Sequence, residues 1–288
     1  EIILMTLINY HPSNIQIAMD VSRSLQEDLG CSTDWTASLI PKDKLSTAIV
    51  TTNQEMTVCG VRWVEYSFLL CDENCQLEWF VEEGQHIAAG TQLVKISGNS
   101  RAMLTAERTA LNFLQTLSAT ATTTRKFVTK AANPGVKIMD TRKTIPGLRL
   151  AQKYAVAIGG GINQRIGLFD GVLIKENHII AHGGITQVLQ YALKQTPKQI
   201  PIQIEVESFA ELKEAVAAGA SLLLLDNMTI AEISQCVDYC KSYQIELEIS
   251  GNVSLDNIHA YAQSGIHRIS IGALTKNIQA IDLSMRFI

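Results

Sequence analysis

The second half of the chain alternates short, largely apolar runs with longer stretches in which apolar residues recur every three or four positions. The apolar runs lie at 136–139, 171–174, 202–207, 221–226, 245–250 and 267–272. The stretches between them, around 148–158, 183–195, 208–218, 229–242 and 254–264, have helical spacing. Apolar strands that alternate with helices are typical of a parallel sheet covered by helices. Because no dinucleotide-binding glycine motif follows the first strand, the pattern favours a closed or nearly closed (β/α) barrel over an open sheet.

The first half of the chain has a different pattern. Residues 15–27 have the spacing of an amphipathic helix, and residues 27–37 are expected to form a loop. From 46 to 80 the pattern is strand-like. Short strands are expected at 48–50, 56–59 and 79–81. The segment 81–98 resembles the hairpin of lipoyl and biotinyl carrier domains, but it has no exposed lysine at a hairpin tip, so we expect only a structural hairpin.

Two helices are predicted before the barrel. The first spans 104–117 and the second 118–130, and Asn133-Pro134-Gly135 ends the second. Arg108 lies off the apolar stripe of the first helix, and its only acidic neighbour, Glu107, is adjacent and not one turn away. Arg108 is therefore a candidate for contacts outside its own helix.

Composition narrows the possible classes. The chain has 288 residues, of which 18% are charged, and no low-complexity stretch, so we expect one large α/β domain or two domains with a sizeable core. No apolar run is long enough to span a bilayer and no export signal is evident, although the printed chain begins with Glu1 and Met5 is a candidate for the natural start. The net charge of -4 argues against nucleic acid as a partner. The six cysteines lack zinc-type spacing, and Cys236 and Cys240 are expected to be buried free thiols, which fits a reducing cytoplasm.

Charged residues, or small residues compatible with a phosphate, stand at the carboxyl ends of the predicted strands of the second half. They are Asp140 with Arg142 and Lys143, Lys175, Glu205 with Glu207, Asp226, Glu248 with Ser250, and Gly272. In a (β/α) barrel these positions converge on one face, where active sites are built. The last two junctions, Ser250-Gly251-Asn252 and Gly272-Ala273, have small residues that let backbone N–H groups approach a phosphate. The sequence therefore predicts a phosphate-binding active site at this face.

A basic cluster lies between Asp140 and His178, in the stretch DTRKTIPGLRLAQKYAVAIGGGINQRIGLFDGVLIKENH. The whole chain has 24 Lys and Arg against 28 Asp and Glu, so this local excess of cations needs a cause. The cations are Arg142, Lys143, Arg149, Lys153, Arg165 and Lys175. They indicate a small polyanionic ligand, because guanidinium groups bind carboxylate and phosphate bidentately. Residues 159–161 are three glycines that follow a helix, so they predict a helix end and a mobile loop carrying Arg165 and not a dinucleotide loop.

The residues at the strand ends include no activated nucleophile. Cys31 has no neighbouring His, and Ser250 lacks a nucleophile-elbow context. Glu207 and Asp226 are suited to stabilise a developing oxocarbenium ion or to hold a divalent metal beside a pyrophosphate, while Arg and Lys hold carboxylates. This inventory favours glycosyl transfer from a sugar pyrophosphate.

The stretch 140–178 resembles the signature of the quinolinate phosphoribosyltransferases, also called decarboxylating nicotinate-nucleotide pyrophosphorylases. Further segments similar to that family occur in the same order along the chain, at 27–36, 106–115, 204–208, 222–228, 248–252 and 269–275. The resemblance implies an α/β chain with an N-terminal α/β sandwich domain and a C-terminal incomplete (β/α) barrel. Residues 1–117 would form the sandwich domain, joined by the C-terminal segment 276–288, and residues 118–275 the barrel.

The resemblance also implies a reaction. Quinolinate and phosphoribosyl pyrophosphate would give nicotinate mononucleotide, pyrophosphate and carbon dioxide with Mg²⁺, in de novo NAD biosynthesis. Arg142 and Arg165, helped by Lys175, would bind the quinolinate carboxylates, and Arg108 would reach in from the partner subunit of a homodimer or a higher assembly of dimers. Lys143 would contact the sugar pyrophosphate or quinolinate.

The remaining roles implied by the resemblance concern the donor. Glu207 and Asp226 would face the ribose and the metal, so that Lys143, Glu207 and Asp226 are the expected catalytic residues. The 5′-phosphate would be held by Ser250, Gly251, Asn252 and Gly272.

One position departs from the family pattern. The family commonly has His before the Arg of its Asn-His-Arg motif, and this chain has Gln164. A neutral amide can donate a hydrogen bond to a carboxylate, so Gln164 is expected to bind substrate, but it cannot become a cation near neutral pH. Two alternatives stay open. The first is a related transferase that uses another substrate, either nicotinate without decarboxylation or a substrate from molybdenum-linked gene clusters. The second is a non-catalytic barrel that senses phosphate or nucleotides.

Overall fold

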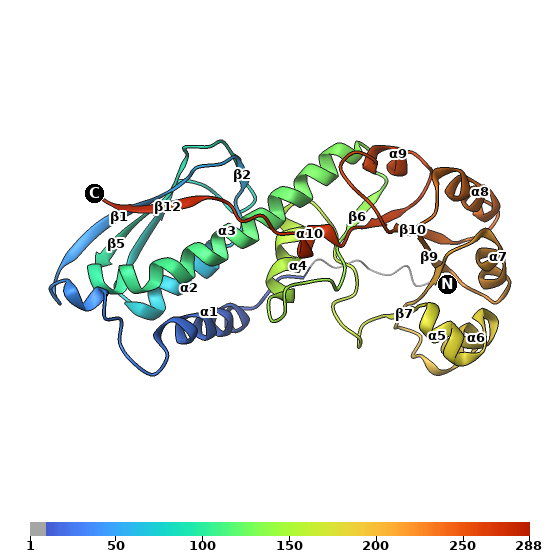
Figure 1. Ribbon diagram of the computed structural model, residues 1–288, viewed down its shortest axis with the longest axis horizontal. Coiled ribbons are helices and arrows are strands. Elements are labelled where there is room, and N and C mark those ends of the chain that lie inside the picture. The colour runs from blue at the N-terminus through green and yellow to red at the C-terminus, as the bar shows by residue number, and fades with distance from the viewer. Residues whose placement is uncertain (1–9) are drawn as a thin grey trace. The chain divides into compact units, whose positions relative to one another are not determined.

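The computed structural model describes residues 10–288, and its chain forms two compact units, each built around its own sheet (Figure 1). One unit consists of residues 10–125, 145–160 and 277–288, and the other includes 126–144 and 161–276. The start predicted at Met5 lies outside the described residues. The predicted α/β class, with an N-terminal α/β sandwich and a C-terminal parallel (β/α) domain, is confirmed.

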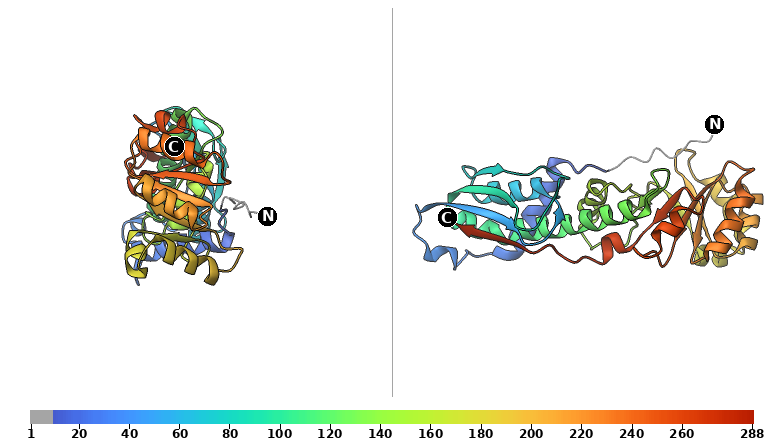
Figure 2. Two further views of the ribbon diagram at one scale, coloured as in Figure 1. Left: turned by 90° about the vertical axis from the view of Figure 1, so that its right-hand side faces the viewer. Right: turned by 90° about the horizontal axis from the view of Figure 1, so that it is seen from above.

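The first unit contains a four-stranded antiparallel sheet in the order β12-β1-β5-β3. The strands are β1 (Leu45–Thr52), β3 (Gln76–Trp79), β5 (Gln92–Asn99) and β12 (Leu283–Phe287). Two further short strands, β2 (Met56–Thr57) and β4 (His86–Ile87), form a separate pair. Figure 2 shows the C-terminal strand, in red, beside β1, in blue, as their antiparallel register requires. The last residues of the chain therefore complete the sheet of the first unit.

The helices of this unit bury their apolar faces in two clusters. α2 (Val61–Cys71) and the first part of α3 (Ser100–Ala131) share one apolar cluster with the sheet, in which Val94 and Ile96 of β5 lie in the same core as Met103 and Leu114 of α3. A second cluster joins α1 (Asn14–Leu29) and α4 (Arg149–Ile158) to the same two helices. Amphipathic helices that each bury one stripe explain this layering, because every stripe faces either the sheet or another stripe.

Three predictions for the first half are corrected by the structure. The strand-like region 46–80 contains the helix α2, in which Trp63, Val64, Ser67 and Phe68 are buried at helical spacing. Aromatic and β-branched residues gave this segment the composition of a strand, but the carboxylate of Glu83 accepts hydrogen bonds from the N–H groups of Gly60 and Val61 and satisfies the start of a helix. This partner lies more than twenty positions away in the sequence, where local patterning does not find it.

The second correction concerns the predicted hairpin at 81–98. β4 pairs with β2, whereas β5 pairs with β1 and β3, so β4 and β5 do not form a hairpin. The connection between them is held to the end of β1 instead, since Gly90 N donates to Thr52 O (2.7 Å) and Thr52 N donates to Thr91 O (3.1 Å). Competition from β1 for the edge of β5 therefore overrides the local turn signal.

The third correction is that the helices predicted at 104–117 and 118–130 are one helix, α3. The Ser and Thr residues after position 117 are accommodated within the helix because the hydroxyls of Thr120 and Thr124 donate to the carbonyls four residues before them. The hydroxyl of Ser118 is buried and holds the backbone of Cys59. The predicted end is confirmed, since α3 stops at Ala131, just before Asn133-Pro134-Gly135.

The second unit contains a six-stranded parallel sheet in the order β6-β11-β10-β9-β8-β7. The strands are β6 (Lys137–Met139), β7 (Val172–Ile174), β8 (Ile202–Val206), β9 (Leu222–Asp226), β10 (Glu246–Ser250) and β11 (Arg268–Ser270). All six predicted strands are therefore confirmed. β6 and β7 are the two edges and, within residues 10–288, no strand joins them, so the predicted barrel is an incomplete one.

Helices follow the strands of this sheet. They are α5 (Glu176–His182), α6 (Ile185–Gln195), α7 (Phe209–Ala217), α8 (Ile230–Cys240), α9 (Ile258–Ala262) and α10 (Ala273–Lys276). In Figure 2 the orange helices α7 and α8 lie on the outside of the strands. α5 was not predicted, and α9 is shorter than expected. Cys236 and Cys240 are free and buried on α8, as predicted.

Candidate active site

The carboxyl ends of the parallel strands bring the predicted site residues of the second unit to one edge of the sheet. The register sets Ser250 of β10 beside Asp226 of β9, and Val206 of β8 beside Leu225. Lys175 follows β7, Glu207 follows β8, and Gly272 lies two residues after β11. In a parallel sheet these ends face the same way, so functional side chains from all six strands share one side.

Three carboxylates form a cluster at this edge. Glu205, Glu207 and Asp226 each offer an oxygen within 4.8 Å of the others. Lys175 Nζ lies 3.0 Å from Glu205 Oε2, and the side chain of Glu205 is only 13% exposed. Glu205 is among the charged residues identified at the strand ends, but the ligand set predicted from the sequence contains only Glu207 and Asp226. Since strand side chains alternate, Glu205 and Glu207 project to the same side, which explains the third member of the cluster.

Burial and repulsion from neighbouring carboxylates perturb Glu207 and Asp226. Desolvation, followed by the charge of Glu205, raises the pKa of Asp226, although Lys175 and Lys143 act in the opposite direction. Desolvation also raises the pKa of Glu207, and neighbouring carboxylates add to this effect. These neighbours are Glu176, Glu211, Asp226 and Glu205. A concentration of negative charge with raised pKa values favours a bound cation, and a divalent ion with oxygen ligands fits this donor set.

Two arginines form the cationic part of the site. Desolvation, followed by the charge of Arg142, lowers the pKa of Arg165, so the two guanidinium groups are close enough to repel each other. Arg165 donates to Gly171 O (2.8 Å), whereas Arg142 Nε is buried without a hydrogen-bond acceptor among the described residues. A buried donor without an acceptor is costly, and so is a pair of like charges. An anion bound between the two arginines would relieve both costs.

The turn that carries Arg165 is held by a buried polar network. The carboxylate of Asp140, which is fully buried, accepts from Asn163 Nδ2 (2.7 Å) and from Gln164 N (2.9 Å). Gln164 Nε2 donates to Gln203 Oε1 (3.0 Å) and to Glu248 Oε1 (3.2 Å). Sequence reasoning missed Gln203, because a polar residue in the middle of a buried strand is interpretable only once its partners are known.

The last two strand ends offer free backbone donors. Gly251 has φ +89°, and a Cβ there would lie 2.2 Å from Asn227 Oδ1, so only glycine fits this position. Asn252 also has a positive φ of 49°, and its side chain donates to Asn227 Oδ1 (3.1 Å). Among the residues that the structure describes, the backbone N–H groups of Gly251, Asn252 and Gly272 have no acceptor. Free N–H groups at such a turn are the donors that a phosphate requires.

Lys143 lies beside the last of these turns. A Cβ at Gly272 would be 3.0 Å from Lys143 Cδ, and Thr275 Oγ1 donates to Lys143 O (2.8 Å). The ammonium group also acts on Asp226, whose pKa it lowers. Lys143 thus lies close to the turn at Gly272 and to the carboxylate cluster.

Arg108 belongs to the other unit. It lies on α3 and is exposed, and within residues 10–288 it forms no ion pair at salt-bridge distance. Gly159 ends α4, with its N–H donating to Ala155 O (3.0 Å), which confirms the predicted helix end at the three glycines. A Cβ at Gly159 would lie 2.4 Å from Ala121 O, so close packing against α3 requires glycine there.

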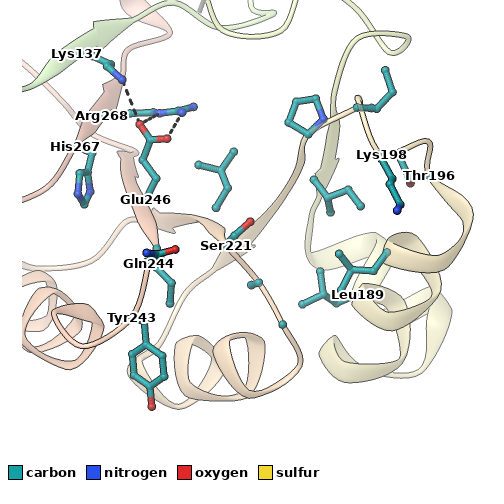
Figure 3. Close-up of a pocket in the computed structure, with 18 of the residues that line it drawn as sticks. Lys137, Leu189, Thr196, Lys198, Ser221, Tyr243, Gln244, Glu246, His267 and Arg268 are labelled. Atoms are coloured by element: carbon teal, nitrogen blue, oxygen red, sulfur yellow. Dashed lines mark hydrogen bonds and ion pairs between the residues drawn. The ribbon is translucent and has the colours of Figure 1, made fainter. Parts of the chain in front are cut away.

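A pocket of about 960 Å³ lies at the opposite, amino-terminal ends of the strands. Figure 3 shows Glu246 in this pocket with Lys137 and Arg268 directed toward its carboxylate. Burial acts to raise the pKa of Glu246, but Arg268 and Lys137 outweigh it and hold that pKa below its usual value. Glu246 is therefore paired with both cations, and in (β/α) barrels this end contributes to stability while chemistry occurs at the other.

Comparison with known proteins agrees with this geometry. A family model described as the N-terminal domain of quinolinate phosphoribosyl transferase matches residues 33–118, and one for the C-terminal domain of the same family matches residues 120–286. The probable nicotinate-nucleotide pyrophosphorylase [carboxylating] of Bacillus subtilis is 34% identical over 273 residues, which are 95% of this chain and 94% of the relative. The chloroplastic nicotinate-nucleotide pyrophosphorylase [carboxylating] of Arabidopsis thaliana is 37% identical over 284 residues, with coverage of 92% and 81%.

Solved structures give the same result. The nicotinate-nucleotide pyrophosphorylase from Francisella tularensis superposes with a TM-score of 0.91 at 42% identity, over 97% of this chain and 98% of that one. A human nicotinic acid phosphoribosyltransferase, at 13% identity and a TM-score of 0.56, shares the fold alone. Among residues 10–288, no helix combines the length and apolarity that crossing a membrane requires. Two family models that together cover nearly the whole chain, with relatives above 30% identity, show that it belongs to the quinolinate phosphoribosyl transferase family.

Proposed function

We propose that this protein transfers the phosphoribosyl group of phosphoribosyl pyrophosphate to the ring nitrogen of quinolinate and releases carbon dioxide. The products would be nicotinate mononucleotide, pyrophosphate and carbon dioxide, in de novo NAD biosynthesis. Family membership and the names of the relatives support this reaction. The observation that carries the proposal is the pair of mutually repelling guanidinium groups, Arg142 and Arg165. They lie at the same sheet edge as a carboxylate cluster and as backbone N–H groups that have no acceptor among the described residues.

The arginine pair suits an acceptor with two carboxylates. Arg142 Nε has no acceptor within residues 10–288, and burial beside Arg142 lowers the pKa of Arg165. Quinolinate would supply two adjacent negative charges and several acceptor oxygens, and Lys175 would add a third cation. Arg108 would approach the acceptor from a partner subunit, which accounts for an exposed arginine on α3 that has no ion pair in the described part of its own chain. A monocarboxylate would neutralise only part of this charge.

The donor would bind along the other strand ends. The N–H groups of Gly251, Asn252 and Gly272, which have no acceptor within residues 10–288, would hold the 5′-phosphate together with the hydroxyl of Ser250, and Lys143 would contact the pyrophosphate. Glu207 and Asp226, joined by Glu205, have the oxygen ligands that Mg²⁺ prefers. Bound there with the donor, Mg²⁺ would neutralise negative charge that develops on the leaving pyrophosphate.

The chemistry would proceed in two stages without a covalent enzyme intermediate. First, the bond between ribose C1 and the pyrophosphate oxygen breaks through an oxocarbenium-like transition state, which the carboxylates of Glu207 and Asp226 stabilise, and the quinolinate nitrogen attacks C1. Second, the bond between ring C2 and its carboxylate breaks. The electron pair is stabilised by the quaternised nitrogen, and C2 takes a proton. The arginines would act mainly by holding the acceptor in line with C1.

Assembly and location complete the proposal. A homodimer, or a higher assembly of dimers, is required if Arg108 acts across an interface. The relatives include proteins named as chloroplastic and mitochondrial as well as a bacterial one, so the predicted cytoplasmic location stays a prediction.

A substrate comparison tests the proposal. The protein is incubated with phosphoribosyl pyrophosphate and Mg²⁺ and either quinolinate or nicotinate, and pyrophosphate release is followed. We expect release with quinolinate and little with nicotinate. Preferential turnover of nicotinate would contradict the assignment of the arginine pair, and ligand binding with neither substrate turned over would indicate a sensor.

A further inference from the structure

The side chain of Gln164 is half-buried, and each of its amide groups is engaged in hydrogen bonds within the protein. Its amide nitrogen has two hydrogens, which go to Gln203 Oε1 (3.0 Å) and Glu248 Oε1 (3.2 Å). Its oxygen accepts from the backbone N–H of Arg165 (3.1 Å). Neither amide hydrogen is left for a substrate carboxylate, although the position corresponds to a predicted ligand of the acceptor.

A third hydrogen bond closes this network into a ring. Gln203 Nε2 donates to Glu248 Oε2 (2.9 Å). Glu248 is fully buried and Gln203 is 5% exposed, so water does not replace these bonds easily. Loss of any partner would leave a buried polar group unsatisfied, which costs more than the bond itself contributes.

The ring fixes the orientation of each amide. An ionised Glu248 only accepts, so both Gln164 and Gln203 must direct their NH₂ groups toward it. Gln203 then presents its oxygen to Gln164, and the oxygen of Gln164 is left facing Arg165 N. The carboxylate of Asp140 holds the same turn from its other side, through Asn163 Nδ2 and Gln164 N. The backbone of Arg165 is thereby held in place next to Arg142.

We infer that Gln164 does not ligate the substrate, and that Gln203 and Glu248 are positioning residues that act through Gln164 to place Arg165 for acceptor binding. This inference rests on the proposed function, because it assigns Arg165 to the acceptor carboxylates. It changes the role of position 164 from a ligand to a support. It also explains why an uncharged residue suffices at a position where the family commonly has His: the site needs a donor toward Glu248 and an acceptor toward Arg165 N, and an amide provides both.

The first test is Glu248→Gln. This variant keeps the shape but adds an NH₂ group that must face another amide NH₂, so one bond of the ring is lost. We expect the KM for quinolinate to rise by about tenfold to a hundredfold, the range for one hydrogen bond to a charged group. The KM for phosphoribosyl pyrophosphate and kcat should change by less than about threefold, since their residues lie outside the ring. The exposed Gln190→Glu on α6 serves as a control for a Gln–Glu exchange.

The second test exchanges the two partners. In Glu248→Gln combined with Gln203→Glu, the carboxylate lies at position 203 and accepts from Gln164 and from the amide at position 248. That amide offers its oxygen to Gln164, so all three bonds and the buried charge are restored with their roles reversed. We expect the quinolinate KM to return to within about threefold of the unchanged protein, as strong coupling between contacting residues predicts. If Glu248→Gln alone does not fold, the double exchange is still measured against the unchanged protein.

Several outcomes would overturn the inference. One is an unchanged quinolinate KM in Glu248→Gln, and another is a double exchange as impaired as the single variant. A crystal structure with quinolinate in which Gln164 Nε2 lies within hydrogen-bond distance of a substrate carboxylate would also contradict it. Failure of the unchanged protein to turn over quinolinate would instead contradict the proposed function, so the two failures are distinguishable.

Discussion

Replacement of Arg142 by alanine tests how the acceptor is bound. Arg142 Nε is buried and has no acceptor among the described residues, and desolvation, followed by the charge of Arg142, lowers the pKa of Arg165. A fork of two charge-assisted hydrogen bonds contributes about 3–6 kcal/mol to acceptor binding, at about 1.5–3 kcal/mol each. Removal of the repulsion returns about 1 kcal/mol. The net loss of about 2–5 kcal/mol corresponds to about a 30- to 4,000-fold rise in the quinolinate KM.

Steady-state kinetics with each substrate varied in turn would measure this effect. We expect Arg142→Ala to raise the quinolinate KM by that factor and the phosphoribosyl pyrophosphate KM by less than about threefold. Arg142→Lys keeps the charge but lacks the fork, so an intermediate rise of about tenfold is expected. Arg286→Ala, at an exposed position on β12, is the control. Unchanged quinolinate kinetics in Arg142→Ala, or an effect confined to the phosphoribosyl pyrophosphate KM, would refute the reasoning.

Three further predictions concern the donor side and the assembly. Asp226→Asn should lower kcat by about a hundredfold or more and weaken the response of the rate to added Mg²⁺. Desolvation, followed by the charge of Glu205, raises the folded-state pKa of Asp226, so the ionised carboxylate reduces stability at neutral pH. The variant should therefore melt at a higher temperature at neutral pH, with the gain vanishing as pH falls toward about 4. Gly251→Ala should raise the phosphoribosyl pyrophosphate KM, since its Cβ would meet Asn227, whereas Gly183→Ala, at φ +91° in open space, carries similar backbone strain and should leave that KM unchanged. Arg108→Ala should be nearly inactive with quinolinate. If Arg108 acts across an interface, an assembly that mixes Arg108→Ala subunits with Arg142→Ala subunits should regain activity. No recovery after confirmed subunit exchange would contradict that arrangement.

The parallel unit was predictable because its signals are local. The strand Leu222–Asp226 is a continuous apolar run that ends in a residue whose charge stands out from its surroundings. The topology of a parallel sheet then brings these ends together without further information. The cluster of Glu207 and Asp226 follows from this rule, and alternation along β8 adds Glu205.

The remaining features depended on partners distant in sequence. α2 begins where Glu83 satisfies its first N–H groups, and β5 pairs with β1 because the connection before it is bound to Thr52. The roles of Gln203 and Gln164 are set by Glu248, which lies 45 and 84 positions away along the chain. Periodicity does not encode such contacts, so the support of Arg165 becomes visible only in the folded structure.

The most direct measurement of the central claim uses quinolinate labelled in its 2-carboxylate. Labelled carbon dioxide and nicotinate mononucleotide are quantified together during turnover with phosphoribosyl pyrophosphate and Mg²⁺. The account predicts one labelled carbon dioxide for each nicotinate mononucleotide formed, and none when phosphoribosyl pyrophosphate is omitted. A mononucleotide that retains the label, or gas release without phosphoribosyl transfer, would contradict it.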